Sequence, residues 1–156
     1  MDDRLIATIL ADHPRIAVVG LSRRVGRPSH EVSAYMQRAG YTITPVNPHC
    51  EEVLGVRCHP DLAAATAAGP LGIVNLFRPP DAVPPFVDQA IALGADAIWM
   101  QLGIVHEGAA RAARAAGIPV VMDRCIKIEH ARFHGGLHLA GFDTGVISSR
   151  RQLLAR

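Results

Sequence analysis

The stretch from Arg15 to Ser29 (RIAVVGLSRRVGRPS) combines the residue types that bind phosphate. An apolar run, Ile16 to Val19, ends at Gly20, and the loop that follows carries Arg23, Arg24 and Arg27. Pro28 and Ser29 are typical of the start of a helix. The free N–H groups and the dipole of a helix N-terminus favour an anion, and arginine suits phosphate oxygens. The stretch therefore predicts a phosphate-bearing ligand at a strand–turn–helix junction.

Two Cys–His pairs, His49-Cys50 and Cys58-His59, are candidate metal ligands. Zinc accepts two sulfurs and two nitrogens, which is the set that these pairs offer. Adjacent residues of a strand point to opposite faces, however, and the seven residues between the cysteines do not match a usual zinc-finger spacing. We expect a structural flap and no metal site, with zinc as the alternative.

Cys125 and the pair His106-Glu107 are the candidates for other chemistry. Cations at Arg124 and Lys127 favour the thiolate of a neighbouring cysteine, although an ordinary half-buried cysteine is the alternative. His106-Glu107 has the types of a general acid–base pair, but a glutamate in a first helical turn also suits the helix dipole. The sequence has no G-x-S-x-G nucleophile elbow. We expect no catalytic residue.

Apolar strands and helical segments alternate along the chain and must position these residues. Strands are expected at 15–21, 41–46, 72–77, 97–102 and 119–122. Helices are expected at 4–11, 29–39, 61–68, 81–94 and 107–116, and Ser29 and Asp81 are the expected caps of two of them. A small hairpin or flap is expected at 50–58. This alternation predicts βαβ units, a parallel sheet and, with right-handed crossovers, a doubly wound α/β fold.

Length and composition favour one compact domain over residues 1–156. Apolar residues make up 49% of the chain and charged residues 19%, which is typical of a globular core. A formal charge of +2 is too small to indicate nucleic acid, and no apolar run reaches the about 20 residues of a membrane span. Three cysteines and a start without a basic, apolar leader favour a cytoplasmic protein.

The carboxyl ends of the strands are where ligands bind in an open α/β sheet. A nicotinamide dinucleotide is disfavoured because the G-x-G-x-x-G pattern is absent and Asn47-Pro48 stands where an acid would bind the ribose. The arginines leave NADP as an alternative. The residues expected at these ends are Gly20, Leu21, Ser22, Asn47, Pro48, Phe77, Arg78, Pro79, Pro80, Gln101, Leu102, Gly103, Asp123, Arg124 and Cys125.

Six short motifs lie at these ends in order: VVGLS (18–22), RPS (27–29), VNP (46–48), FRPP (77–80), WMQLG (99–103) and MDRC (122–125). Together they resemble the small bacterial CoA-binding proteins, which are relatives of the CoA-binding domain of the succinyl-CoA synthetase alpha subunit. The resemblance implies a Rossmann-like, doubly wound, parallel five-stranded sheet with helices on both faces. It covers a core of about 14–131 and leaves 132–156 as a C-terminal extension.

The resemblance also implies a ligand, coenzyme A or an acyl-CoA, and a place for each of its parts. The phosphates would lie against Gly20, Leu21, Ser22, Arg23, Arg27, Pro28 and Ser29. Asn47 and Pro48 would border the ribose or the adenine. Phe77, Arg78 and Pro79 would flank the adenosine part. The pantetheine arm would follow Gln101 and Gly103 toward Cys125, where a mixed disulfide with CoA is one hypothesis.

The expected role is that of a non-catalytic carrier, sensor or regulator, because the phosphorylated histidine of the ligases belongs to a domain that this chain is too short to contain. The alternative is an NADP- or CoA-dependent enzyme that uses the same crevice. A third hypothesis is a scaffold, or a homo-oligomer, that uses the extension at 132–156 as its contact. No nucleic-acid or membrane partner is expected.

Overall fold

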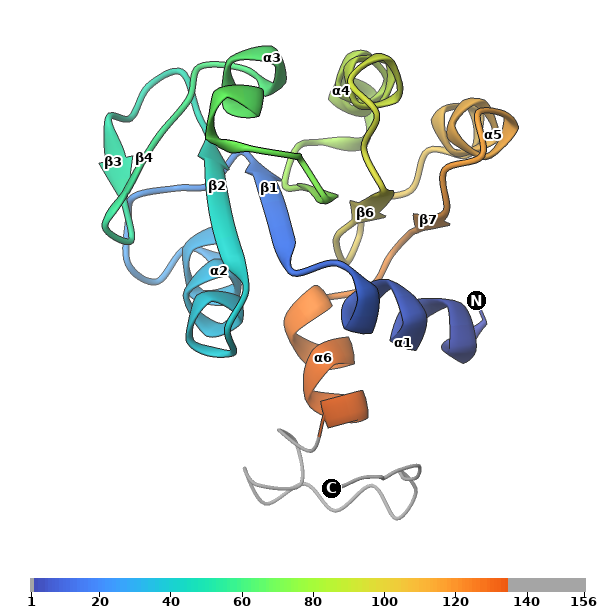
Figure 1. Ribbon diagram of the computed structural model, residues 1–156, viewed down its shortest axis with the longest axis horizontal. Coiled ribbons are helices and arrows are strands. Elements are labelled where there is room, and N and C mark those ends of the chain that lie inside the picture. Colours follow the sequence, from blue (N-terminus) through green and yellow to red (C-terminus); the bar gives the residue numbers. More distant parts are fainter. Residues whose placement is uncertain (1, 135–156) are drawn as a thin grey trace.

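The computed structural model of the chain describes residues 2–134 and has a five-stranded parallel sheet at its centre (Figure 1). The strand order is β2-β1-β5-β6-β7, with every neighbouring pair parallel. The doubly wound α/β fold predicted from the alternation of strands and helices is confirmed. The strands are β1 (Arg15–Val19), β2 (Thr42–Val46), β5 (Ile73–Leu76), β6 (Ala97–Met100) and β7 (Val120–Val121).

Helices cover both faces of the sheet (Figure 1). On one face lie α1 (Asp3–Asp12), α2 (Pro28–Arg38) and α6 (Ile126–His134), and on the other lie α3 (Leu62–Ala65), α4 (Val83–Ala92) and α5 (Glu107–Ala115). Alternate residues of β1 supply the two cores, because successive strand side chains point to opposite faces. Ile16 and Val18 pack with α1, α2 and α6, whereas Ala17 and Val19 pack with α3, α4 and α5.

The strand order reverses between β1 and β5. The chain leaves β1 for β2 on one side and then crosses back to β5 on the other. Ligands of open α/β sheets bind at such a reversal, beyond the carboxyl ends of the strands. The ends in question are Gly20, which follows β1, and Phe77, which follows β5.

A small antiparallel hairpin stands outside the main sheet, as predicted for residues 50–58. It consists of β3 (Glu52–Val53) and β4 (Val56–Arg57) and lies beside β2. A single β-bridge joins His59, just after the hairpin, to Val46 of β2. Two 3₁₀ turns, η1 (Thr66–Ala68) and η2 (Pro80–Ala82), complete the connections. We call residues 48–59, which include the hairpin, the flap.

Two local predictions are wrong. Ser29 does not cap α2: Arg27 occupies the cap position, Pro28 begins the helix, and the Ser29 hydroxyl turns inward. Asp81 lies within η2, so α4 begins after Ala82 without a side-chain cap.

The helix α6 was not predicted. Its apolar residues form no regular stripe, because Ile128 is exposed while Glu129 is buried. Within residues 2–134, no helix has the length and apolar character that a membrane crossing requires. The C-terminal extension lies, from residue 135 on, outside the described residues, and the contact role expected for it stays a prediction.

Candidate functional site

The turn after β1 brings the backbone of Gly20 against the end of β5. Gly20 has a φ of +84°, and a Cβ there would lie 2.7 Å from the carbonyl oxygen of Phe77. The Gly20 amide donates to the Val46 carbonyl at 3.0 Å, and the Phe77 amide donates to the Val19 carbonyl at 3.0 Å. Glycine is required here for its backbone conformation and for space. The site is therefore built around a fixed, side-chain-free corner.

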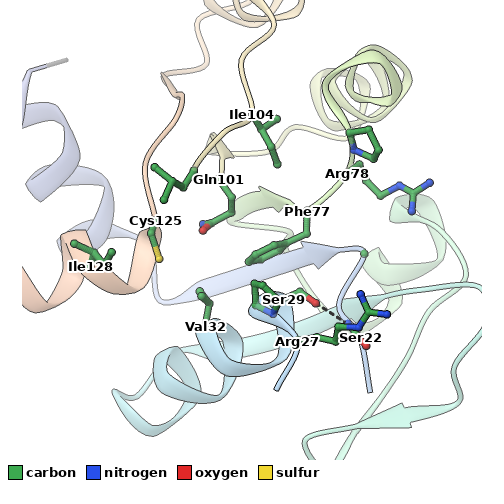
Figure 2. Close-up of a pocket in the computed structure, with 14 residues that line it drawn as sticks. Ser22, Arg27, Ser29, Val32, Phe77, Arg78, Gln101, Ile104, Cys125 and Ile128 are labelled. Carbon is green, nitrogen blue, oxygen red and sulfur yellow. Dashed lines mark hydrogen bonds between the residues drawn. The ribbon is translucent and has the colours of Figure 1, made fainter. Parts of the chain in front are cut away.

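A pocket of about 610 Å³ opens beside this corner, and we call it the larger pocket (Figure 2). Its lining residues come from the carboxyl ends of β1, β5 and β6 and from α2 and α6, which lie far apart in the sequence. It is lined by Gly20, Ser22, Arg27, Pro28, Ser29, Val32, Phe77, Arg78, Pro79, Gln101, Leu102, Ile104, Cys125 and Ile128.

One end of the larger pocket is cationic. Arg27 and Arg78 line it, and Arg23 and Arg24 are exposed on the neighbouring loop. Among residues 2–134, none of the four makes an ion pair. Arginines left without a carboxylate partner are available for an external anion, and guanidinium groups match phosphate oxygens well.

Hydrogen bonds within the chain fold the arginine loop, residues 22–27, onto the first turn of α2. The Ser22 amide donates to the Ser29 hydroxyl at 2.9 Å, and the Arg24 amide donates to the Ser22 hydroxyl at 3.1 Å. The Gly26 amide donates to a Glu31 carboxylate oxygen at 3.0 Å, and this bond, followed by His30, lowers the pKa of Glu31. The loop thus gets its shape from its own polar groups, and its guanidinium groups have no partner among residues 2–134.

A smaller pocket of about 320 Å³ lies on the other side of the turn, and it shares Gly20, Ser22 and Arg78 with the larger pocket. Asn47 borders it, and its side chain is held by two bonds: Nδ2 donates to the Leu21 carbonyl at 2.9 Å, and Oδ1 accepts from the His49 amide at 2.8 Å. The remaining wall is largely apolar and consists of Val19, Val46, Pro48, Pro60 and Phe86, together with His49.

The other end of the larger pocket is apolar and contains one thiol. Cys125 lies there beside Ile128, and Val32 and Ile104 line the same pocket (Figure 2). Gln101 lies between the two ends and is 4% exposed. Its Nε2 donates to Asn75 Oδ1 at 2.8 Å, whereas Oε1 has no hydrogen-bond partner among the described residues. The pocket therefore changes from cationic to apolar along its length, with a carbonyl acceptor between.

Most of the predicted site residues come together in these two pockets, and Arg23 lines a third hollow of about 530 Å³ beside the flap. Leu21 and Gly103 line none of the three. The Leu21 side chain is fully buried and only its carbonyl serves the site, through Asn47. Gly103 is exposed, and its amide donates to Asp123 Oδ1 at 2.7 Å.

Sequence reasoning placed Leu102 at a strand end but missed three other apolar residues of the larger pocket: Val32, Ile104 and Ile128. Val32 carried a signal, because it follows Ser29 by three residues and shares its helix face. Ile128 carried none, since the helix that bears it was not predicted.

The remaining candidates for chemistry have structural roles. His106 caps α5, and its Nδ1 accepts from the Ala109 amide at 3.0 Å. The Cys50 thiol donates to the Glu52 carbonyl at 3.2 Å, and burial followed by the neighbouring Cys50 raises the pKa of Cys58 to about 12. Within the described part of the chain, no three His, Cys, Asp or Glu side chains converge as a metal site requires.

Comparisons with known proteins agree with this arrangement. A family profile described as a CoA binding domain matches residues 14–131. The uncharacterized protein YneT of Bacillus subtilis (strain 168) is 44% identical over 126 residues, which are 81% of this chain and 92% of YneT. A hypothetical protein from Pyrococcus horikoshii OT3 has a similar structure, with a TM-score of 0.80, 36% identity, and coverage of 85% of this chain and 92% of that one. A structure from Thermus thermophilus has a TM-score of 0.75 and 34% identity, and covers 85% of this chain and 98% of its own.

Proposed function

Because the chain belongs to the family of CoA-binding domains, we propose that it binds coenzyme A or an acyl-CoA at the carboxyl ends of its parallel strands. Its role is that of a carrier, sensor or regulator without catalysis of its own. One observation carries the proposal: a pocket at the reversal of the strand order is cationic at one end and apolar at the other. CoA has the same polarity, from phosphates through pantetheine to thiol.

The phosphate end of the proposal rests on Arg27 and Arg78, with Arg23 and Arg24 nearby. CoA carries a pyrophosphate and a ribose 3′-phosphate, so it needs several cations. Guanidinium groups that have no ion-pair partner in residues 2–134 can meet that charge without breaking existing pairs. The N-terminus of α2 adds a favourable dipole.

The adenosine part suits the smaller pocket, which shares the turn residues Gly20 and Ser22 with the larger one. A flat apolar base gains free energy from burial against side chains such as Val46, Pro60 and Phe86. Asn47 contributes mainly by holding the turn in place, because both of its amide atoms are already bonded within the chain.

The pantetheine arm suits the apolar end of the larger pocket. Pantetheine alternates methylene groups with amides, and a site for it needs apolar walls with isolated polar groups. Val32, Ile104 and Ile128 supply the walls, and Gln101 Oε1 supplies an acceptor for an amide N–H.

Thermal-shift measurements with CoA, dephospho-CoA, acetyl-CoA, NAD and NADP test the proposal. A ligand that binds only the folded state raises the melting temperature. We expect CoA to raise the melting temperature more than dephospho-CoA does, because the arginines can bind the 3′-phosphate that dephospho-CoA lacks. Stabilisation by NADP without stabilisation by CoA would favour the enzyme alternative and contradict the proposal.

A further inference from the structure

We propose that Cys125 captures CoA covalently and reversibly, as a mixed disulfide formed in the larger pocket. This inference rests on the proposed function. Two features lie side by side in a pocket whose other end is cationic: a thiol that forms no disulfide, and a Gln101 carbonyl that has no hydrogen-bond partner among the described residues.

The place of Cys125 matches the end of the proposed ligand. In Figure 2 Arg27 and Arg78 lie on one side of the pocket, Cys125 lies on the other, and Gln101 and Phe77 lie between. With the phosphates at the arginines and pantetheine along Gln101, the CoA thiol is directed toward the Cys125 end. An acyl-CoA has no free thiol, so the capture distinguishes CoA from its thioesters.

Gln101 is a second, independent observation that this part of the pocket suits the amide groups of pantetheine. The residue is 96% buried, as its 4% exposure implies, and its amide faces the pocket beside Cys125 (Figure 2). Its N–H side is satisfied by Asn75 and its carbonyl is not satisfied within the described residues. The bond to Asn75 fixes the orientation of the amide and leaves Oε1 open to the pocket, where a donor on a ligand can reach it.

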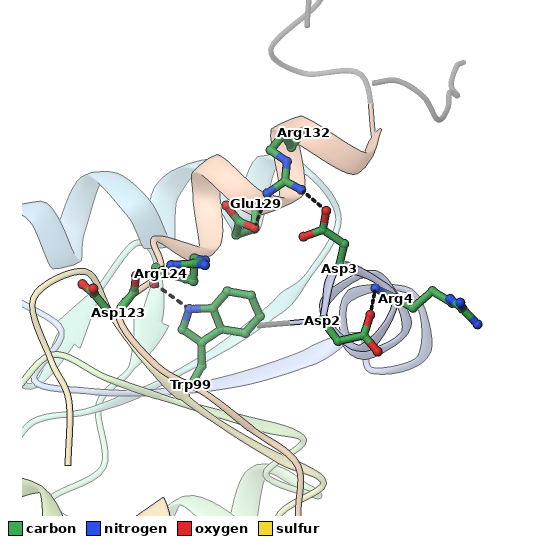
Figure 3. A network of polar contacts seen from close by, with 8 residues as sticks. All are labelled: Asp2, Asp3, Arg4, Trp99, Asp123, Arg124, Glu129 and Arg132. Carbon is green, nitrogen blue, oxygen red and sulfur yellow. Dashed lines mark hydrogen bonds and ion pairs between the residues drawn. The ribbon is translucent and has the colours of Figure 1, made fainter. Parts of the chain in front are cut away.

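The backbone on both sides of Cys125 is held firmly. Asp123 has a φ of +58°, which costs a non-glycine residue about 1–3 kcal/mol and persists only where the surroundings impose it. The Gly103 amide donates to Asp123 Oδ1 at 2.7 Å, and the indole of the fully buried Trp99 donates to the Arg124 carbonyl at 2.8 Å (Figure 3).

The helix that follows Cys125 is anchored as well. The Cys125 carbonyl accepts the first hydrogen bond of α6, from the Glu129 amide at 3.0 Å. Arg132 then joins Glu129 and Asp3, each at 2.8 Å, and so ties α6 to α1 (Figure 3). The backbone on both sides of Cys125 is therefore anchored beside the pocket that its side chain lines.

The other two cysteines serve as internal controls. Cys50 and Cys58 lie on the flap and neither lines the larger pocket. Cys58 is 7% exposed, whereas Cys125 is half-buried and faces the pocket. A disulfide reagent that is recognised through its CoA part should therefore react at Cys125 alone.

The reaction is a thiol–disulfide exchange with CoA disulfide. The Cys125 thiolate attacks one sulfur of the CoA disulfide, a bond forms between Cys125 and that CoA, and the original S–S bond breaks. The second CoA leaves as a thiolate and takes up the proton that Cys125 released. One disulfide replaces another, so no further oxidant is consumed, and an added thiol reverses the exchange.

Intact-mass spectrometry of the full chain with CoA disulfide tests the inference. We expect one CoA adduct per chain, released by reductant and mapped to Cys125 in a peptide digest. Cys125→Ser abolishes the adduct, and the matched Cys50→Ser/Cys58→Ser variant keeps it. Because binding places the reacting sulfurs together, modification by CoA disulfide is at least about tenfold faster than by glutathione disulfide.

Binding of CoA by the wild-type chain in the presence of reductant is measured in parallel. Binding without an adduct overturns the inference and leaves the proposed function standing. An adduct on Cys50 or Cys58, or equal rates with the two disulfides, overturns the inference too. Failure to bind CoA in reductant overturns the proposed function itself. Peptide mapping of the wild type decides the site even where Cys125→Ser does not fold.

Discussion

Gly20 and Phe77 touch through their backbones: a Cβ at Gly20 would lie 2.7 Å from the Phe77 carbonyl oxygen. This approach joins the ends of β1 and β5 at the point where the strand order reverses. The corner borders both pockets, since Gly20 lines each of them.

Replacing Gly20 by alanine should destabilise the fold and weaken CoA binding together. The substitution forces a side chain into a φ of +84° and against the Phe77 carbonyl, so we expect a loss of about 2–3 kcal/mol. Urea denaturation measures it. Gly26→Ala is the matched control: its φ is +95° but a Cβ there meets nothing within 4 Å, so the loss should be about 1 kcal/mol. Equal losses for the two variants would contradict the steric argument.

Removing a pocket arginine should weaken CoA binding without unfolding the protein. Arg27 is exposed and has no ion pair in residues 2–134, so Arg27→Ala should leave the melting temperature of the free protein unchanged. A charged hydrogen bond is worth about 1.5–3 kcal/mol, so the affinity should fall about tenfold or more. Isothermal titration calorimetry checks this, with Arg114→Ala on α5, an exposed arginine outside both pockets, as the control. A CoA affinity that Arg27→Ala leaves intact would remove this residue from the phosphate site.

The hydrogen bond between Gln101 and Asn75 should appear as coupling in a double-mutant cycle. Each residue is buried, and each single change to leucine leaves its partner unsatisfied at a cost of about 1–3 kcal/mol. The double variant should lose less than the sum of the single losses, because both polar groups are then gone. Denaturant unfolding of the four proteins gives the coupling. Strict additivity would show that the bond contributes nothing to stability.

Acid should destabilise the protein through His130. Burial, followed by the neighbouring His134, lowers the pKa of His130 from 6.5 to about 4, and its ring is held by the Tyr35 hydroxyl at 3.0 Å. The unfolded chain therefore binds the proton first, so this contribution is complete above about pH 6.5 and is lost as the pH falls toward 4. Its size is at most about 3 kcal/mol.

Glu129 acts in the opposite direction, because burial raises its pKa and its protonation then favours the folded state. The free energy of unfolding, measured at several pH values between 7 and 4, checks the balance, and His130→Gln should flatten the profile. A wild-type profile that is already flat over this interval would contradict the assignment.

The strands and most of the helices could be predicted because their signals are local. Apolar runs bounded by glycine or proline predicted β1, β2, β5, β6 and β7. The same reasoning failed at Asp81 and Ser29, where serine and aspartate suit a cap but the helix starts are set by the prolines around them. It also failed at α6, whose stability comes from packing against α1 and α2 and not from an apolar stripe of its own.

The sequence by itself determined that residues suited to phosphate follow β1 and that Gly20, Asn47, Phe77, Gln101 and Cys125 stand after successive strands, since chain order and strand direction suffice for that. Only the tertiary structure decided that the Gln101 carbonyl is left open while its N–H side meets Asn75, and that Cys125 faces the larger pocket while Cys50 and Cys58 do not. These relationships depend on side chains brought together by the sheet order and by α6, and no local pattern encodes such contacts.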